Sequence, residues 1–379
     1  MKFVLAPDKF KGSLTGFEFC DAVEMGIRKV FPHATIIKKP LADGGDGTLD
    51  VVKEYLKASE VRVTVHDPLF RKIQAQYLFS KKRKVAFIEM SEASGLRLLK
   101  PKELDCMKTT TLGTGELILD ALNKGAKQIF LGIGGSATND GGMGVAMALG
   151  YSFLDKEGKP LSPIGENLTK VHTIYAPEKS LSQGVEFKIA CDVNNPFYGP
   201  QGAAHIYAAQ KGATKEQIVL LDDGLRWFAG KISETMSIDL QKIEGAGAAG
   251  GLGGGSVAFL GGNLISGIEL VKEIADFETS LINVNWIITG EGKLDSQTLS
   301  GKTMSGVLES AKKTKIGVAA FCGVVELTEA EQEQMGLTYV TSILRDFQTL
   351  EEAMQSSYEN LIFAAFNFAK ILKKDITIF

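Results

Sequence analysis

Apolar residues near both ends of the chain form short runs, and each run is followed by a stretch with helical spacing. Residues 3–6 predict a buried strand, and a capping box of Thr15 and Glu18 predicts a helix that ends at Pro32. Further strands are expected at 34–41, 286–289, 316–321 and 339–344, and further helices at 49–56, 305–312 and 350–372. Five strands that each lead into a helix indicate a parallel sheet with helices on both faces.

The middle of the chain has a different pattern, in which short alternating strands are mixed with helices. Strands are expected at 61–65, 75–79, 85–90, 128–133, 152–154 and 187–190, with a helix at 114–123. The mixture predicts an inserted α/β domain. We therefore expect one domain from residues 1–60 and 266–379, and a second from residues 61–265.

Composition limits the class of protein. The chain has 379 residues, enough for two domains, and its net charge of −3 provides no general attraction to nucleic acid or to an anionic membrane. No run of about 18 apolar residues predicts a membrane span, and the N-terminal run stops at Pro7, unlike a signal peptide. Four widely spaced cysteines favour free thiols in a reducing compartment. We expect a cytoplasmic protein without nucleic-acid or membrane partners; the oligomeric state is not predicted.

The 42 glycines gather in loops that follow predicted strands, together with carboxylates, hydroxyls and lysines. In the loop after the first strand, Asp8 stands at the strand end, and Lys11 and the helix start near Ser13 suit an anion. In the loop after the second strand, Asp43 and Asp46 are hard oxygen ligands suited to Mg²⁺. The alternatives are solvated loop charges in the first loop, and a turn with a helix cap in the second.

A third glycine-rich loop covers residues 132–142. Its consecutive amides at Gly134, Gly135 and Ser136 predict a phosphate cradle, and Asn139 and Asp140 are candidates to bind substrate. A plain strand-to-helix turn is the alternative.

The fourth loop, residues 289–303, contains Glu291, Asp295 and Lys302. Two carboxylates and an amine suit phosphoryl transfer, which needs charge neutralisation and a carboxylate to orient the acceptor hydroxyl. The segment is not a P-loop, because Ser296 stands where that motif requires glycine. Asp192, which follows a predicted strand, is either catalytic or part of an Asx-type turn.

Two segments invite a dinucleotide-binding interpretation. Residues 245–250 have the formal spacing GxGxxG, but no buried strand precedes them, so we expect a mobile loop that closes over nucleotide or substrate. Residues 132–137 fit the GxGxxA form after a strand, and Asp155 and Glu157 follow about 20 residues later. An NAD-dependent oxidoreductase is therefore one alternative function, and a regulator that only binds nucleotide is another.

Taken together, the motifs resemble the type I glycerate kinase family. The resemblance spans the chain from residue 1 to the 340s and is carried by APDKFKGSL (6–14), ADGGDGT (42–48), GIGGSATNDGG (132–142), GAGAAGGLGGG (245–255) and TGEGKLDSQTLSGK (289–302). Lys9 stands where the family usually has serine, and Asp46 where it usually has glutamate.

The resemblance implies a kinase that uses ATP and Mg²⁺ to phosphorylate D-glycerate, with 2-phosphoglycerate favoured over 3-phosphoglycerate as product. A kinase for another small hydroxy acid remains an alternative. The resemblance also implies a flavodoxin-like domain built from both chain ends and an inserted mixed α/β domain, and we expect the active site in the cleft between them.

Our expected mechanism is direct in-line transfer without a phospho-enzyme. Asp295 or Asp192 is the expected base, Lys11 or Lys302 neutralises the transferring group, and Asp43 and Asp46 bind the metal. The residues expected to bind phosphate or substrate are Asp8, Ser13, Gly134, Gly135, Ser136, Asn139, Asp140 and Glu291.

Overall fold

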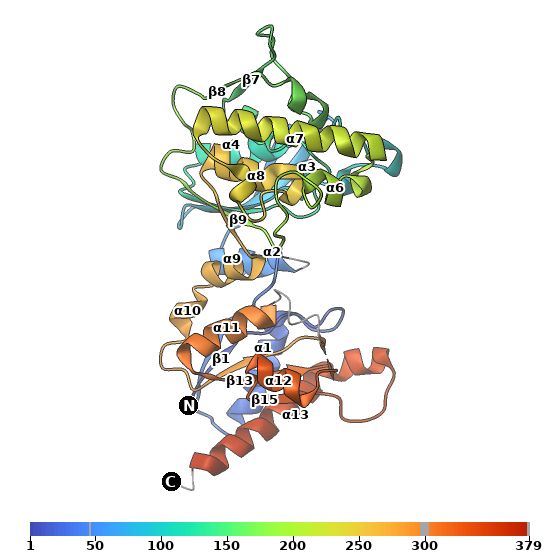
Figure 1. Ribbon diagram of the computed structural model, residues 1–379. Coiled ribbons are helices and arrows are strands. Elements are labelled where there is room, and N and C mark those ends of the chain that lie inside the picture. Colours follow the sequence, from blue (N-terminus) through green and yellow to red (C-terminus); the bar gives the residue numbers. More distant parts are fainter. Residues whose placement is uncertain (45–46, 296–302, 377–379) are drawn as a thin grey trace. The chain divides into compact units, whose positions relative to one another are not determined.

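The computed structural model describes residues 1–44, 47–295 and 303–376 (Figure 1). The chain divides into two compact units. The first unit consists of residues 1–55 and 271–379, and the second unit of residues 56–270. In the described ranges, no helix combines the length and apolar character needed to cross a membrane.

The first unit contains a parallel five-stranded sheet. Its strands are β1 (Lys2–Leu5), β2 (Thr35–Lys38), β11 (Trp286–Thr289), β13 (Gly317–Cys322) and β15 (Tyr339–Ser342). Their spatial order is β2-β1-β11-β13-β15, and every neighbouring pair is parallel. In chain order this is 2-1-3-4-5, the flavodoxin-like arrangement. The predicted fold class is confirmed.

Alternating side chains bury both faces of this sheet. Phe3 and Leu5 of β1 lie in one core cluster with residues of α1 (Gly16–Arg28) and α13 (Leu350–Ile376). The intervening Val4 is also fully buried, because strand side chains alternate between faces. The other helices of this unit are α2 (Thr48–Leu56), α9 (Gly267–Ile274), α10 (Phe277–Ser280), α11 (Thr303–Thr314) and α12 (Glu329–Met335); α2 and α9 cross the division between units.

Helix α1 begins as the sequence predicts, with Thr15 as N-cap and the reciprocal Glu18 contact both in place. It ends at Arg28, before Pro32, and the chain continues in turns through Phe31. Helix α13 approaches α1 closely, since a Cβ at Gly26 would lie 2.5 Å from the carbonyl oxygen of Ile362. Only glycine permits this backbone contact.

The second unit has a six-stranded mixed sheet of order β10-β9-β6-β5-β4-β3. Its strands are β3 (Ser59–His66), β4 (Lys72–Ser80), β5 (Val85–Glu89), β6 (Gln128–Gly132), β9 (Glu186–Ala190) and β10 (Asn263–Ile265). The pairs from β5 to β10 are parallel, whereas β3, β4 and β5 pair antiparallel. Each strand that the sequence predicts in this part of the chain is present, whereas β10 was not predicted.

Helices and two smaller sheets complete the architecture. The second unit contains α3 (Ser91–Ser94), α4 (Leu112–Asn123), α5 (Met143–Ala148), α6 (Ala203–Tyr207), α7 (Lys215–Met236) and α8 (Ala248–Leu260), with a small hairpin of β7 (Ser152–Leu154) and β8 (Thr173–Tyr175). In the first unit, β12 (Lys293–Leu294) pairs with β14 (Val324–Val325).

One prediction in this region is wrong. Residues 245–255 are not a mobile loop, because Gly250 to Gly255 are buried and belong to α8. The backbone of Ala249, Gly250 and Gly251 is left-handed, which interrupts the helix near its start. The glycines allow close backbone packing here: a Cβ at Gly250 would lie 2.0 Å from the carbonyl oxygen of Thr138.

Candidate functional site

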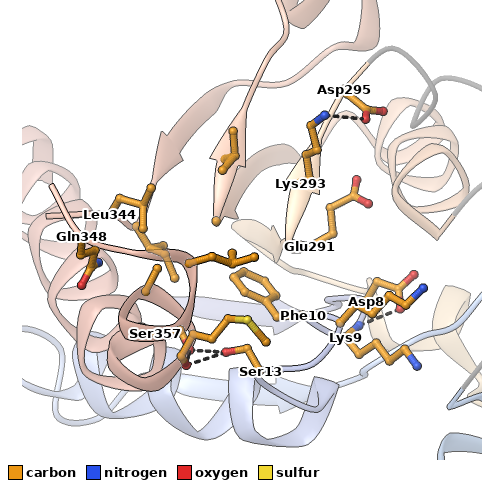
Figure 2. A pocket seen from close by; sticks show the side chains of 18 of the residues that line it. Asp8, Lys9, Phe10, Ser13, Glu291, Lys293, Asp295, Leu344, Gln348 and Ser357 are labelled. Carbon is orange, nitrogen blue, oxygen red and sulfur yellow. Dashed lines mark hydrogen bonds and ion pairs between the residues drawn. The ribbon is translucent and has the colours of Figure 1, made fainter. Parts of the chain in front are cut away.

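A pocket of about 910 Å³ lies within the first unit, at the carboxyl ends of its parallel strands. Asp8 follows β1, Asp43 follows β2, and Glu291 follows β11; all three line the pocket. Figure 2 shows Asp8 and Glu291. Since the strands are parallel, their carboxyl ends meet at one sheet edge, where ligands bind in open α/β sheets. The structure thus brings together three carboxylates from remote parts of the chain.

The pocket also has an apolar wall and several lysines. Phe10 lies among the lining side chains, and Asp295 faces Lys293 across 3.6 Å (Figure 2). Lys293 also pairs with Glu326 at 2.8 Å. The predicted residue Lys11 lines the pocket and is exposed. Other lining residues are Lys9, Val324, Ile343, Leu344, Leu350, Ala353 and Met354. An apolar wall beside charged groups is the usual composition of a small-molecule site.

Asp8 is a carboxyl group of this pocket whose pKa is shifted by its surroundings. Its Oδ2 accepts a hydrogen bond from the Thr303 hydroxyl at 2.6 Å, and its Oδ1 accepts one from the Lys9 amide at 2.7 Å. Burial nevertheless raises its pKa, and the negative charge of Asp43 raises it further. Two carboxylates that repel each other in this way form a place where a cation is stabilising.

That arrangement fits Mg²⁺, which usually binds one or two protein carboxylates and takes its other ligands from phosphate and water. The part of the chain that the structure describes contains no cluster of three histidine, cysteine or acidic side chains suited to a metal. Asp8 and Asp43 are therefore the described candidates. The predicted ligand Asp46 and the predicted catalytic Lys302 lie outside the described residues.

Ser13 has a structural environment inside the same pocket. Its hydroxyl donates to the carbonyl oxygen of Met354 at 2.9 Å and lies 2.5 Å from the hydroxyl of Ser357 (Figure 2). Both partners belong to α13. These contacts hold the first loop against α13, and they favour a positioning role for Ser13 over the predicted direct contact with an anion.

The second unit contains the predicted phosphate cradle, in the loop between β6 and α5. Gly134 and Gly135 are exposed, and Gly135 has a positive φ of 71°. Among the described residues, the amides of Gly134, Gly135 and Ser136 donate no hydrogen bond, whereas the next amide, of Ala137, donates to Ser94. Three consecutive unused amides fit the predicted anion cradle.

Asp140 holds this loop in place. Its carboxylate is fully buried and accepts hydrogen bonds from the amide and the hydroxyl of Thr111 and from the amides of Gly142 and Gly144. Burial raises the pKa of Asp140, and these four donors oppose the rise. With its oxygens occupied in this way, Asp140 suits a structural role rather than the predicted contact with substrate.

The neighbouring Asn139 is different. Its side chain is fully buried, and neither its oxygen nor its nitrogen has a hydrogen-bond partner among the described residues. Buried amides normally find partners, so this unpaired group is a candidate to bind a polar ligand, as the sequence predicts. Asp192, after β9, accepts a hydrogen bond from the Gly267 amide at 2.8 Å. Gly267 begins α9, 75 residues further along the chain, so this contact is not the local Asx-type turn that the sequence offered as the alternative.

The structure adds two residues that the sequence did not single out. Glu89 ends β5 and pairs in register with Gly132 at the end of β6. A Cβ at Gly132 would lie 2.5 Å from Glu89 Oε2, so the glycine leaves room for the carboxylate directly before the cradle. Burial, reinforced by the charge of Glu92 and opposed by Arg97, raises the pKa of Glu89 to about 7. Its only sequence signal is a charged residue ending an apolar strand.

The second added residue is Lys211, which is 2% exposed. Its ammonium donates to the hydroxyl of Ser136 and to the carbonyl oxygen of Thr138, each at 2.7 Å. A lysine in a polar stretch of sequence gives no sign of burial, so the contact could only be found in the folded structure.

Comparison with known proteins identifies the family. The model of the glycerate kinase family matches residues 3–373. The chain belongs to the glycerate kinase family. Its relatives include a glycerate kinase of Bacillus cereus and a glycerate 2-kinase of Escherichia coli K12, each 41% identical with 98% of both chains covered. A solved structure of a candidate glycerate kinase 2 from Salmonella typhimurium LT2 has a TM-score of 0.86 and 39% identity, and the match covers 100% of this chain and 99% of that one.

These findings confirm the predicted resemblance. Members of the glycerate kinase family are phosphotransferases that act on an alcohol group of glycerate, so the predicted enzyme class is confirmed as well. The NAD-dependent oxidoreductase is not favoured. Of the GxGxxA positions at residues 132–137, Gly132 makes room for the Glu89 carboxylate, Gly134 belongs to the cradle, and Ala137 is buried.

Proposed function

We propose that this protein transfers the γ-phosphoryl group of ATP to the 2-hydroxyl of D-glycerate, giving 2-phosphoglycerate and ADP. The observation that carries the proposal is the family match along residues 3–373, joined by 41% identity to a relative named glycerate 2-kinase. Phosphoryl transfer relies mainly on positioning and on neutralising charge. The residues of the two units supply groups for both tasks.

The pocket of the first unit suits a nucleotide with its metal. Its apolar wall, which includes Phe10 and Met354, offers a surface for the adenine ring of the nucleotide, and its carboxylates offer ligands for a cation. We assign Asp8 and Asp43 to Mg²⁺, together with Asp46. When bound, Mg²⁺ neutralises phosphate charge and orients the phosphate oxygens. Lys11 and Lys302 remain our candidates for neutralising the transferring group.

The cradle of the second unit suits an anionic group of a substrate. The free amides of Gly134, Gly135 and Ser136 point to a carboxylate or phosphate, and the buried amide of Asn139 suits a hydroxyl or a further oxygen. Asp140 keeps the cradle in shape through its contacts with Thr111.

The transfer also needs a group that takes the proton of the glycerate hydroxyl. Asp295 and Asp192 remain candidates, and the geometry at the end of β5 adds Glu89. A base with a pKa near the working pH is the most effective, and the raised pKa of Glu89 supports it in this role. The proton leaves the hydroxyl as its oxygen attacks the γ-phosphorus in line, and ADP departs without a phospho-enzyme.

The test is a coupled assay of ADP release with glycerate, glycolate, lactate and tartronate as acceptors. We expect glycerate to give the highest kcat/KM, and phosphorus NMR of the product to show the coupling pattern of a phosphate on the secondary hydroxyl. Release of ADP with another of these acids but not with glycerate would replace glycerate as substrate. No acceptor-dependent release at all would refute the proposal.

A further inference from the structure

Lys211 occupies a fixed and enclosed position in the second unit. It ends a short 3₁₀ turn, Ala209–Lys211, between α6 and α7 (Figure 1). Its amide donates to the Ala208 carbonyl at 3.0 Å, and its carbonyl accepts from the Cys106 amide at 3.2 Å. The next residue, Gly212, has a φ of 93°, and a Cβ there would lie 2.1 Å from the Leu104 carbonyl oxygen. The backbone therefore directs the lysine into the interior.

The burial of this ammonium group is costly and is not balanced by an ion pair. Among the described residues, no carboxylate lies within 4.0 Å of Lys211 Nζ, and its two hydrogen bonds are to a hydroxyl and a carbonyl oxygen. An isolated buried charge costs several kcal/mol in general. By contrast, the equally buried Lys272 pairs with Glu278 at 3.1 Å. Lys211 is thus a buried positive charge with no carboxylate in direct contact.

The contact with Ser136 conveys this charge to the cradle. An ammonium group can only donate, so Ser136 Oγ is the acceptor in the 2.7 Å contact, and the serine proton is left to point elsewhere. That proton has no acceptor among the described residues. A hydroxyl that accepts from a cation is a stronger donor, and it adjoins the free amides of Gly134 and Gly135.

We propose that Lys211 is a positioning residue that makes the Gly134–Ser136 cradle an anion site, with its charge reaching the bound anion through the hydroxyl of Ser136. The anion is a substrate carboxylate or phosphate, so the inference rests on the proposed function. Thr138 lies in the same network, since its carbonyl oxygen accepts from the same ammonium group. This Lys211–Ser136 contact, called the relay below, fixes the loop in place and adds positive charge beside the cradle.

The relay makes anion binding depend on pH in a definite direction. Burial lowers the pKa of Lys211 to about 8, while the charges of Cys106 and Asp140, the titratable groups that face it, oppose the shift. A bound anion favours the protonated lysine, so affinity is full below pH 8 and is lost as pH rises. The protonated fraction falls about tenfold between pH 7 and pH 9. The KM for the substrate held by the cradle should therefore rise about tenfold over that range.

The experiment compares wild type, Lys211→Met, Ser136→Ala and the double variant, with Lys272→Met as a control for removing a buried lysine. For each protein, KM and kcat for glycerate and for ATP are measured at pH 7, 8 and 9, and binding of glycerate and of ADP is measured by calorimetry. Lys211→Met should raise one KM at pH 7 by on the order of 10- to 100-fold and flatten its pH dependence. The double variant should be no worse than Lys211→Met.

The substrate whose KM moves identifies the anion: glycerate indicates the carboxylate, and ATP indicates a phosphate. The relay is refuted if Ser136→Ala, which keeps the fold and the lysine, binds both ligands as tightly as wild type. It is also refuted if the losses in the two single variants multiply in the double variant. Failure of the proposed function looks different, because wild type would then turn over no glycerate while calorimetry still reports binding of ligands to the cradle.

Discussion

Replacing Asp140 by asparagine should destabilise the second unit far more than its conservative chemistry suggests. Three of the four donors converge on one oxygen of the carboxylate, Oδ2, and the fourth, the Gly142 amide, contacts Oδ1 at 3.1 Å. Asparagine can keep its oxygen toward the three donors, but its NH₂ group then faces the Gly142 amide. One hydrogen bond becomes a donor facing a donor in a fully buried place.

The magnitude follows from that count. A lost hydrogen bond costs about 1 kcal/mol net, and a buried donor without a partner costs about 1–3 kcal/mol more. Removing the desolvated charge returns part of this sum, which leaves about 2 kcal/mol. Asp140→Ala, which abandons all four donors, should cost roughly 3–5 kcal/mol. For a unit spanning residues 56–270, a loss of about 2 kcal/mol lowers the melting temperature by roughly 4–8 °C.

The two tryptophans allow the units to be followed separately. Trp227 belongs to the second unit and Trp286 to the first, and the chain has no others. In a Trp286→Phe background, fluorescence reports the surroundings of Trp227, whose indole donates to the Val171 carbonyl at 2.7 Å. Urea and thermal unfolding of Asp140→Asn in this background give the shift directly.

The control is Asp155→Asn, because Asp155 also accepts backbone hydrogen bonds, from Glu157 and Lys159, but at an exposed turn. Its transition should move less than that of Asp140→Asn. The reasoning about Asp140 is refuted if its variant unfolds at the same urea concentration as the parent, or if, in a separate Trp227→Phe background, the Trp286 signal shifts while the Trp227 signal does not.

Three further predictions concern activity and packing. Glu89→Gln should lower kcat on the order of 100-fold and abolish the loss of activity below about pH 7. Glu92→Gln should keep kcat and move that loss to lower pH, because the charge of Glu92 raises the pKa of Glu89. Unchanged pH–rate profiles in both variants would exclude Glu89 as the base. Gly250→Ala should cost about 2 kcal/mol or more in unfolding experiments, whereas Gly230→Ala, in open space on α7, should be neutral or stabilising. Chelation of divalent cations should abolish turnover, and Asp43→Asn should raise the Mg²⁺ concentration needed for half-maximal rate; full activity in chelator would remove the metal from the mechanism.

The fold could be predicted from the sequence where its signals are local. The capping box of Thr15 and Glu18 correctly located the start of α1, because both contacts lie within one turn. The five apolar runs at the chain ends correctly indicated a parallel sheet, because buried parallel strands are apolar on both faces. The end of α1 was predicted too late, since proline excludes a helix beyond it but does not require the helix to reach it.

The errors and omissions have tertiary causes. Residues 245–255 were taken for a mobile loop, yet their glycines are buried because other segments approach them within contact distance. Asp140 was expected to contact substrate, but its partner Thr111 is 29 residues away in sequence. Lys211 and Ser136 are 75 residues apart, so no local pattern could connect them.

The interior place of β1 in its sheet means that the sheet cannot be completed until late in synthesis. β1 hydrogen-bonds to β2 on one side and to β11 on the other, and β11 is translated only after the whole of the second unit. A nascent chain that has reached residue 270 therefore has every residue of one folding unit, while β1 still presents an unpaired edge. Such an edge is a template for pairing with other chains. The interval between the emergence of residue 270 and that of residue 289 is where we expect a ribosome-associated chaperone to protect this protein most.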